Sequence, residues 1–159
     1  MLPCSDPFLY MQIILFQPQI PQNTGNVIRT CSVTGTSLTL VTPLGFNLSS
    51  RQLRRAGMDY FEGVDFQTLD NLEEFLEQTP HPFYFLSSKA EKKYTDVQYG
   101  KDDILIFGSE SSGLPETLWE RWPEHFVTIP MKPESRCLNL ATSTGIVLFE
   151  ALRQQNFNF

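Results

Sequence analysis

Residues 104–115 read Ile104-Leu105-Ile106-Phe107-Gly108-Ser109-Glu110-Ser111-Ser112-Gly113-Leu114-Pro115. Four apolar residues followed by a glycine are typical of a buried strand in a parallel sheet. Gly108 and Gly113 allow the backbone to approach a ligand closely, and Pro115 suits the first turn of a following helix. Glu110 disfavours a phosphate cradle and fits a cationic or hydroxyl-bearing ligand better. The stretch therefore predicts either a ligand loop at the end of a strand or a plain strand-to-helix turn.

Other short apolar runs, bounded by proline, glycine or polar residues, predict strands at 12–16, 37–42, 83–86 and 126–129. Helices are predicted at 24–34, from Ser49 or Ser50 to just before Gly57, from Asp70 to just before Pro80, and at 139–154. Strands that alternate with helices indicate an α/β fold, with a mostly parallel sheet flanked by helices. Such sheets bind ligands at the carboxyl ends of their strands.

Several polar residues have the positions of helix caps. Asn23 is expected to cap the helix at 24–34, which Gly35 ends. Asp70 followed by Glu73 has the spacing of a capping box, with aspartate in place of serine or threonine.

The chain has 159 residues, with no repeat or linker that divides it, which predicts one domain. Residues 1–10 precede a second methionine, Met11, and are interpreted as an N-terminal extension of a single domain at 11–159. The longest apolar run is far shorter than the roughly 20 residues that a membrane-spanning helix needs. We therefore expect no membrane partner.

The cysteines and histidines are few. Three cysteines form no CxxC pair, and the two histidines have no metal-ligand spacing between them. We therefore expect no disulfide framework and no metal, but reduced thiols in a cytoplasmic protein.

The formal net charge of −6 argues against non-specific nucleic-acid binding over the whole surface. The 12 basic residues are unevenly placed, because arginines cluster at 51–55 and lysines at 89–93. A local basic patch on an acidic protein remains compatible with an RNA partner.

Two further loops carry more polar residues than a connection requires. Residues 21–29 place two asparagines, a glycine and Arg29 at a predicted helix start, which suits a polar or anionic ligand; a solvated helix face is the alternative. Residues 129–140 place Cys137 before the last helix. Because no histidine lies near it in the sequence, Cys137 is interpreted as a small buried thiol and not as a nucleophile.

Taken together, these stretches resemble the SPOUT class of S-adenosylmethionine-dependent RNA methyltransferases. Specifically, the chain resembles the small single-domain tRNA (cytidine/uridine-2′-O)-methyltransferases that act at the wobble nucleotide 34. The matching motifs are Asn-Thr-Gly-Asn-x-x-Arg at 23–29, Leu-Arg-Arg-Ala-Gly at 53–57, Phe-Gly-x-Glu-x-x-Gly-Leu-Pro at 107–115, and Ile-Pro-Met…Arg-x-x-Asn-Leu at 129–140. The resemblance extends over about residues 11–155.

The resemblance implies a C-terminal deep trefoil knot, a homodimer with active sites shared between the chains, and the anticodon loop of tRNA as substrate. It also implies S-adenosylmethionine as methyl donor and S-adenosylhomocysteine as product. The residues that it implies for catalysis are Arg29, Asn139, Asn23 and Glu110. Those implied for binding the donor are Leu86, Gly108, Glu110, Gly113, Ile129, Cys137 and Leu138, and those for tRNA are Asn26, Arg51, Arg54, Arg55 and Arg136.

The chain departs from the family pattern in its last motif. Where the family commonly has Arg-Ser-x-Asn-Leu-Ser-Asn, this sequence has Cys137 in place of the first serine and Thr142 in place of the last asparagine. A thiol is a weaker hydrogen-bond donor than a hydroxyl, so Cys137 is expected to bind the donor mainly through its backbone.

Three alternatives stay open at this point. The chain could methylate another tRNA or ribosomal RNA ribose, it could bind the cofactor without activity, or it could be a small nucleotide- or flavin-binding redox protein. The absence of both GxGxxG and GxxxxGK[ST] argues against the last.

Overall fold

The computed structural model describes residues 10–49, 51–57 and 63–159. Apart from Tyr10, the predicted extension at 1–10 lies outside these residues, as do Cys4 and Ser50. The strands are β1 (Gln12–Phe16), β2 (Ser37–Val41), β3 (Phe66–Leu69), β4 (Phe83–Leu86), β5 (Ile104–Phe107) and β6 (Phe126–Val127). The helices are α1 (Pro21–Thr34), α2 (Arg51–Gly57), α3 (Leu72–Gln78), α4 (Glu116–Arg121) and α5 (Leu140–Gln154), with 3-10 turns η2 (Tyr94–Asp96) and η3 (Pro123–His125).

The six strands form one parallel sheet in the order β3-β2-β1-β5-β4-β6. Ile14 lies between Thr39 of β2 and Ile106 of β5 in the register of the sheet. The predicted mostly parallel α/β sheet is therefore confirmed.

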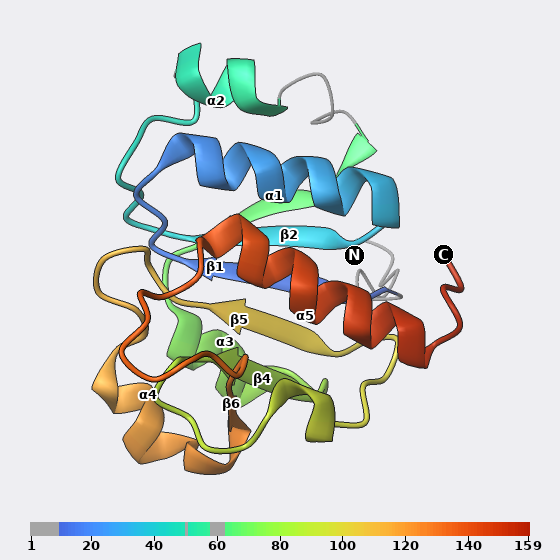
Figure 1. The fold of residues 1–159 in the computed structure, drawn as a ribbon. Helices are drawn as coiled ribbons and strands as arrows, with labels where there is room; N and C mark the ends of the chain where they lie inside the picture. The colour runs from blue at the N-terminus through green and yellow to red at the C-terminus, as the bar shows by residue number, and fades with distance from the viewer. Residues whose placement is uncertain (1–9, 50, 58–62) are drawn as a thin grey trace.

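Helices cover both faces of this sheet (Figure 1). Residues of α1, α2 and α5 pack on one face against a cluster that includes Ile13, Leu40 and Phe107. Residues of α3 and α4 pack on the other face against Ile14, Phe85 and others. Because alternate strand residues point to opposite faces, continuous apolar strands such as β5 contribute to both clusters.

The strand order brings the carboxyl ends of β1, β5, β4 and β6 next to one another at one edge. The chain runs outward from β1 through β2 to β3, and the later strands are added on the other side of β1. β5 and β1 are therefore neighbours at which the direction of strand addition reverses, which is where open α/β sheets bind ligands.

Several predicted boundaries and caps differ from the structure. β3 was not predicted, because Phe66–Leu69 is only half-buried and lies at an edge of the sheet. The strand predicted at 126–129 ends at Val127. Helix α1 begins at Pro21, and its N-cap residue, Ile20, makes no side-chain cap.

The prediction that Asn23 and Asp70 cap helices is wrong. Asn23 lies inside α1, and its side chain bonds to other loops of the site. Helix α3 is capped by Asn71, which accepts a hydrogen bond from the Glu74 backbone N–H, whereas Asp70 accepts one from the hydroxyl of Thr42. Both side chains therefore form tertiary hydrogen bonds instead of the helix caps that their spacing in the sequence predicted.

Candidate active site

A cavity of about 560 Å³ opens at the carboxyl ends of the strands. Its wall comes from the loops after β4, β5 and β6, together with the first turn of α1. All the residues that the sequence predicted for donor binding line it: Leu86, Gly108, Glu110, Gly113, Ile129, Cys137 and Leu138. Segments distant in sequence thus contribute to one wall.

The loop after β5 is folded back on itself. The Ser109 and Gly113 backbones exchange two hydrogen bonds, with N···O distances of 3.1 and 2.9 Å. Gly113 has a φ of +65°, which lies in the left-handed region that favours glycine because glycine has no side chain to clash. A Cβ atom on Gly108 would lie 2.4 Å from the carbonyl carbon of Gly113, so this turn requires glycine at both positions.

Glu110 joins this loop to the start of α1. One carboxylate oxygen accepts a hydrogen bond from the Gln19 backbone N–H at 2.8 Å, and the other accepts one from the Ile20 N–H at 3.0 Å. The side-chain amide of Asn23 donates to the second oxygen at 3.2 Å. The carboxylate thus accepts hydrogen bonds from donors at a helix N-terminus, where negative charge is stabilised.

Asn23 extends the same network to the loop after β6. Its side-chain oxygen accepts a hydrogen bond from the Asn139 amide nitrogen at 2.8 Å. The oxygen of Asn139 in turn accepts hydrogen bonds from the Ala141 and Thr142 backbone N–H groups, so Asn139 caps α5, as the prediction of a helix start there required. Glu110, Asn23 and Asn139 therefore hold two cavity loops against α1.

The loop after β4 is attached to the chain that follows β6. The Ser87 N–H donates to the Val127 carbonyl, and the Thr128 N–H donates to the Lys92 carbonyl. Cys137 is exposed, and its sulfur lies 3.7 Å from the Ser88 hydroxyl. The prediction of a buried thiol at position 137 is wrong, because the chain approaches α5 over the surface of the cavity. Of the two cysteines that the structure describes, Cys31 is the buried one, and burial raises its pKa to about 12.

The remaining predicted residues lie outside the cavity wall. Arg29 and Asn26 are exposed on α1, and Arg136 is exposed in the loop before α5. Arg51, Arg54 and Arg55 are exposed on α2, which packs against α1 (Figure 1). Within one chain, the structure thus brings together Asn23, Glu110 and Asn139 but not Arg29.

The cavity wall also contains residues that sequence reasoning missed. Among them are Ile20, Ser88, Lys89, Trp119 and Met131. Ser109 also belongs to the wall, and its buried hydroxyl has no hydrogen-bond partner within the described residues. Ser109 and Met131 lie inside quoted motifs, and Ser88 and Lys89 follow the predicted strand that ends at Leu86, so their positions were the available signal. No signal in the motifs indicated Trp119, which lies in α4.

The described residues contain no group of three or more histidine, cysteine or acidic side chains that could hold a metal ion. In the same part of the chain, no helix is both long enough and apolar enough to cross a membrane.

Comparison with known proteins identifies the class. The model of the SpoU rRNA methylase family matches residues 10–149, and the chain belongs to this family. The tRNA (cytidine(34)-2′-O)-methyltransferase of Methylovorus glucosotrophus is 43% identical over 147 residues, which cover 91% of this chain and 96% of the relative. The enzyme of the same name from Saccharophagus degradans is also 43% identical, with the same coverage.

Solved structures agree with this assignment. One, described as giving insights into the 2-OH methylation of C/U34 on tRNA, has a TM-score of 0.86 and 42% identity, and the match covers 92% of this chain and 97% of that one. The AdoMet-bound rRNA methyltransferase of Sinorhizobium meliloti has a TM-score of 0.79 and 28% identity, with coverage of 91% of this chain and 56% of that one.

Proposed function

We propose that the protein transfers a methyl group from S-adenosylmethionine to the ribose 2′-hydroxyl of the wobble nucleotide, cytidine or uridine 34, of tRNA. The observation that carries this proposal is the cavity, whose wall contains every residue that the sequence motifs predicted for donor binding. Relatives named for this reaction match nearly the whole chain.

The cavity fits a donor of this size and chemistry. A volume of about 560 Å³ lies within the range of roughly 300–1,000 Å³ that is usual for small-molecule sites. The unpartnered Ser109 hydroxyl and the close turn at Gly108 provide polar and backbone contacts, while Leu86, Ile129 and Leu138 provide apolar ones. When bound, S-adenosylmethionine supplies a sulfonium methyl group that is already activated for attack.

Arg29 acts on the ribose oxygen as a positioning and electrostatic group. An arginine stays protonated in proteins, so it is a poor proton acceptor but a good partner for a developing alkoxide. Because Arg29 lies on the exposed side of α1 and outside the cavity wall of its own chain, we assign it to the cavity of a second subunit. Loss of one such donor typically lowers turnover about a hundredfold or more.

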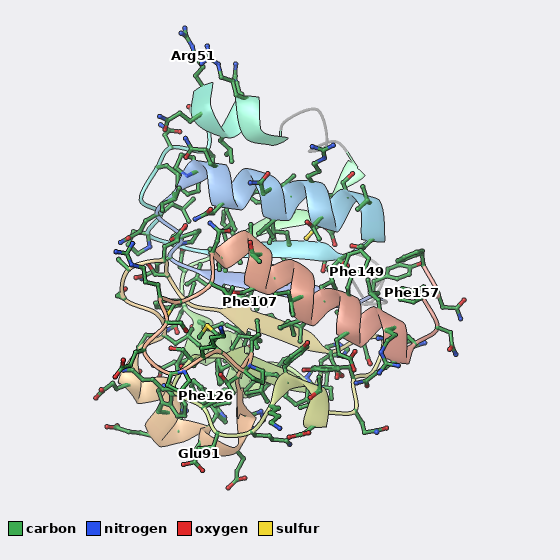
Figure 2. All side chains as sticks on the ribbon, in the orientation of Figure 1. Arg51, Glu91, Phe107, Phe126, Phe149 and Phe157 are labelled. Atoms are coloured by element: carbon green, nitrogen blue, oxygen red, sulfur yellow. The ribbon has the colours of Figure 1, made fainter. Side chains whose placement is uncertain are left out.

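A homodimer through the layer of α1 and α5 accounts for this placement. The two helices pack together on one face of the sheet (Figure 1) and expose Val33 at 63% and Phe149 at 45%. Phe157, which follows α5, is also exposed, and Figure 2 shows it on the same side of the molecule as Phe149. Large apolar side chains exposed on one layer are typical of an interface.

Mixing two inactive variants tests the shared site. Arg29→Ala and Asn139→Ala each remove one side of it. If the site combines two chains, random mixed dimers contain one intact site and recover roughly a quarter of wild-type activity. Sites contained within one chain would recover none.

The family resemblance also supports three finer proposals. The segment between β6 and α5 is threaded as the trefoil knot of the SPOUT class, residues 11–159 form the methyltransferase domain with 1–10 as an extension, and the enzyme works in the cytoplasm, where its tRNA substrate is found.

Nucleoside mass spectrometry of tRNA from cells with and without this protein tests the proposed reaction. We expect loss of 2′-O-methylation at nucleotide 34 alone, restored by the wild type and not by Arg29→Ala. Loss at another ribose would indicate a different RNA substrate. Unchanged RNA together with tight S-adenosylhomocysteine binding would indicate a binding protein without activity.

A further inference from the structure

Basic residues are concentrated beside the cavity. The segments 87–93 and 129–137 contain four of the five lysines of the chain, namely Lys89, Lys92, Lys93 and Lys132, together with Arg136. They contain only two acidic residues, Glu91 and Glu134. A chain with a net charge of −6 thus has a local excess of positive charge here, which we call the lysine rim.

The backbone of the lysine rim is fixed although its side chains are exposed. The Thr128 N–H donates to the Lys92 carbonyl at 2.8 Å, and the Tyr94 N–H donates to the Thr128 carbonyl at 2.9 Å. Lys93 pairs with Thr128 as a parallel bridge that continues the sheet beyond β6. The four lysine side chains are exposed, and none forms an ion pair among the described residues.

The lysine rim also borders the cavity. Lys89 lies in the cavity wall, and Lys132 lines a second hollow of about 420 Å³. The two hollows share Ser88 and Cys137 among their lining residues, so they adjoin along the loop before α5. A strand that delivers its ribose to the cavity over this side therefore passes the lysines.

We propose that the lysine rim holds the phosphates of the tRNA strand next to the target nucleotide. The inference rests on the proposed function and specifies the surface that binds the substrate. Within one chain, the arginines of α2 lie away from this side of the cavity, because Figure 2 places Arg51 and Glu91 at opposite ends of the molecule. Exposed ammonium groups without carboxylate partners suit phosphate oxygens, whose counterions are released on binding.

The triple variant Lys92→Ala, Lys93→Ala, Lys132→Ala tests this surface. Lys89 is left intact because it lies in the donor cavity. The hydrogen bond between Lys92 and Thr128 uses the backbone carbonyl of Lys92, so replacement by alanine preserves it. The matched control is Lys101→Ala, since this exposed lysine precedes β5 and lies at the amino ends of the strands, away from the cavity.

Binding of an unmodified tRNA transcript is measured by fluorescence anisotropy at several salt concentrations with S-adenosylhomocysteine present. For the triple variant we expect at least roughly tenfold weaker binding and a salt slope that is smaller by about 2, because each lost phosphate contact removes about 0.7–0.9. Lys101→Ala keeps the wild-type slope, and all three proteins bind S-adenosylhomocysteine with the same affinity in calorimetry.

Two failures can be told apart. If the wild type methylates tRNA and the triple variant binds it with an unchanged affinity and salt slope, the lysine rim is overturned and the proposed function stands. If the wild type neither binds nor methylates tRNA, both proposals fall.

Discussion

Replacing Glu110 with alanine removes the carboxylate that connects the loop after β5 to α1. The Gln19 and Ile20 N–H groups lie near solvent and can bond to water, so each lost hydrogen bond costs about 1 kcal/mol. The amide of Asn23, a residue only 6% exposed, loses an acceptor at a cost of about 1–3 kcal/mol. We expect a total of about 3–5 kcal/mol and a Tm lower by roughly 6–20 °C for a domain of this size.

The same change is expected to weaken donor binding. The loop that Glu110 anchors forms part of the cavity wall, so part of the lost free energy reappears as the cost of ordering that loop around the donor. A tenfold rise in the Kd of S-adenosylhomocysteine corresponds to about 1.4 kcal/mol, roughly a quarter to a half of the loss. Calorimetry measures this Kd, and the pH dependence of kcat is expected to stay unchanged because no proton passes through the carboxylate.

Ser111→Ala is the matched control in the same loop. Its exposed hydroxyl donates to the Gln19 side chain at 2.6 Å, a neutral hydrogen bond worth at most about 1 kcal/mol. Suppose instead that Glu110→Ala melts at the wild-type temperature and binds S-adenosylhomocysteine normally, yet loses turnover. The carboxylate would then take part in the chemical step, and the positioning role inferred from its three hydrogen bonds would be wrong.

Other predictions test the cavity and the core. Iodoacetamide near pH 8 should alkylate the exposed Cys137 and spare Cys31, because burial raises the pKa of Cys31 to about 12. S-adenosylhomocysteine should slow the alkylation of Cys137. Peptide mass spectrometry measures the alkylation of both cysteines, and equal rates at the two would contradict the structure. Gly108→Ala places a Cβ atom 2.4 Å from the carbonyl carbon of Gly113, so the affinity for S-adenosylhomocysteine should fall more than about tenfold. In Gly63→Ala the nearest atom to the new Cβ is the Ser32 hydroxyl oxygen at 3.7 Å, so this variant should change the free energy of unfolding by less than about 0.5 kcal/mol. Burial raises the pKa of Asp103, so its carboxyl favours the folded state at low pH and loses this contribution as pH rises through the raised pKa. The Tm of Asp103→Asn relative to wild type should therefore increase from acid to neutral pH in thermal melts, and a constant difference would refute the assignment.

Much of the fold could be predicted from local patterns. The buried strands β1, β4 and β5 coincide with short apolar runs, and α5 begins where Asn139 provides a cap. These features depend on residues close together in sequence, so their signal is present before the chain folds. β3 was not predicted, because this half-buried edge strand lacks a continuous run of apolar residues.

The candidate site could be predicted only in part. The motifs identified the loops that line the cavity, because glycine and asparagine are favoured where backbone must turn tightly. They did not indicate that the Asn23 side chain forms hydrogen bonds with Glu110 and Asn139 instead of capping its own helix. They also placed Arg29 with the other catalytic residues, although it lies outside the cavity of its own chain.

The sequence by itself determined where buried strands and ligand loops would form, because burial and turn geometry depend on the residue types within a few positions. The tertiary structure alone decided the strand order, the exposure of Cys137 and the network around Glu110. Its hydrogen bonds join residues 87–116 positions apart, and such partners are selected only when the parallel strands align their carboxyl ends at one edge. Physically, contacts of that separation follow from how whole elements pack, which no local pattern encodes.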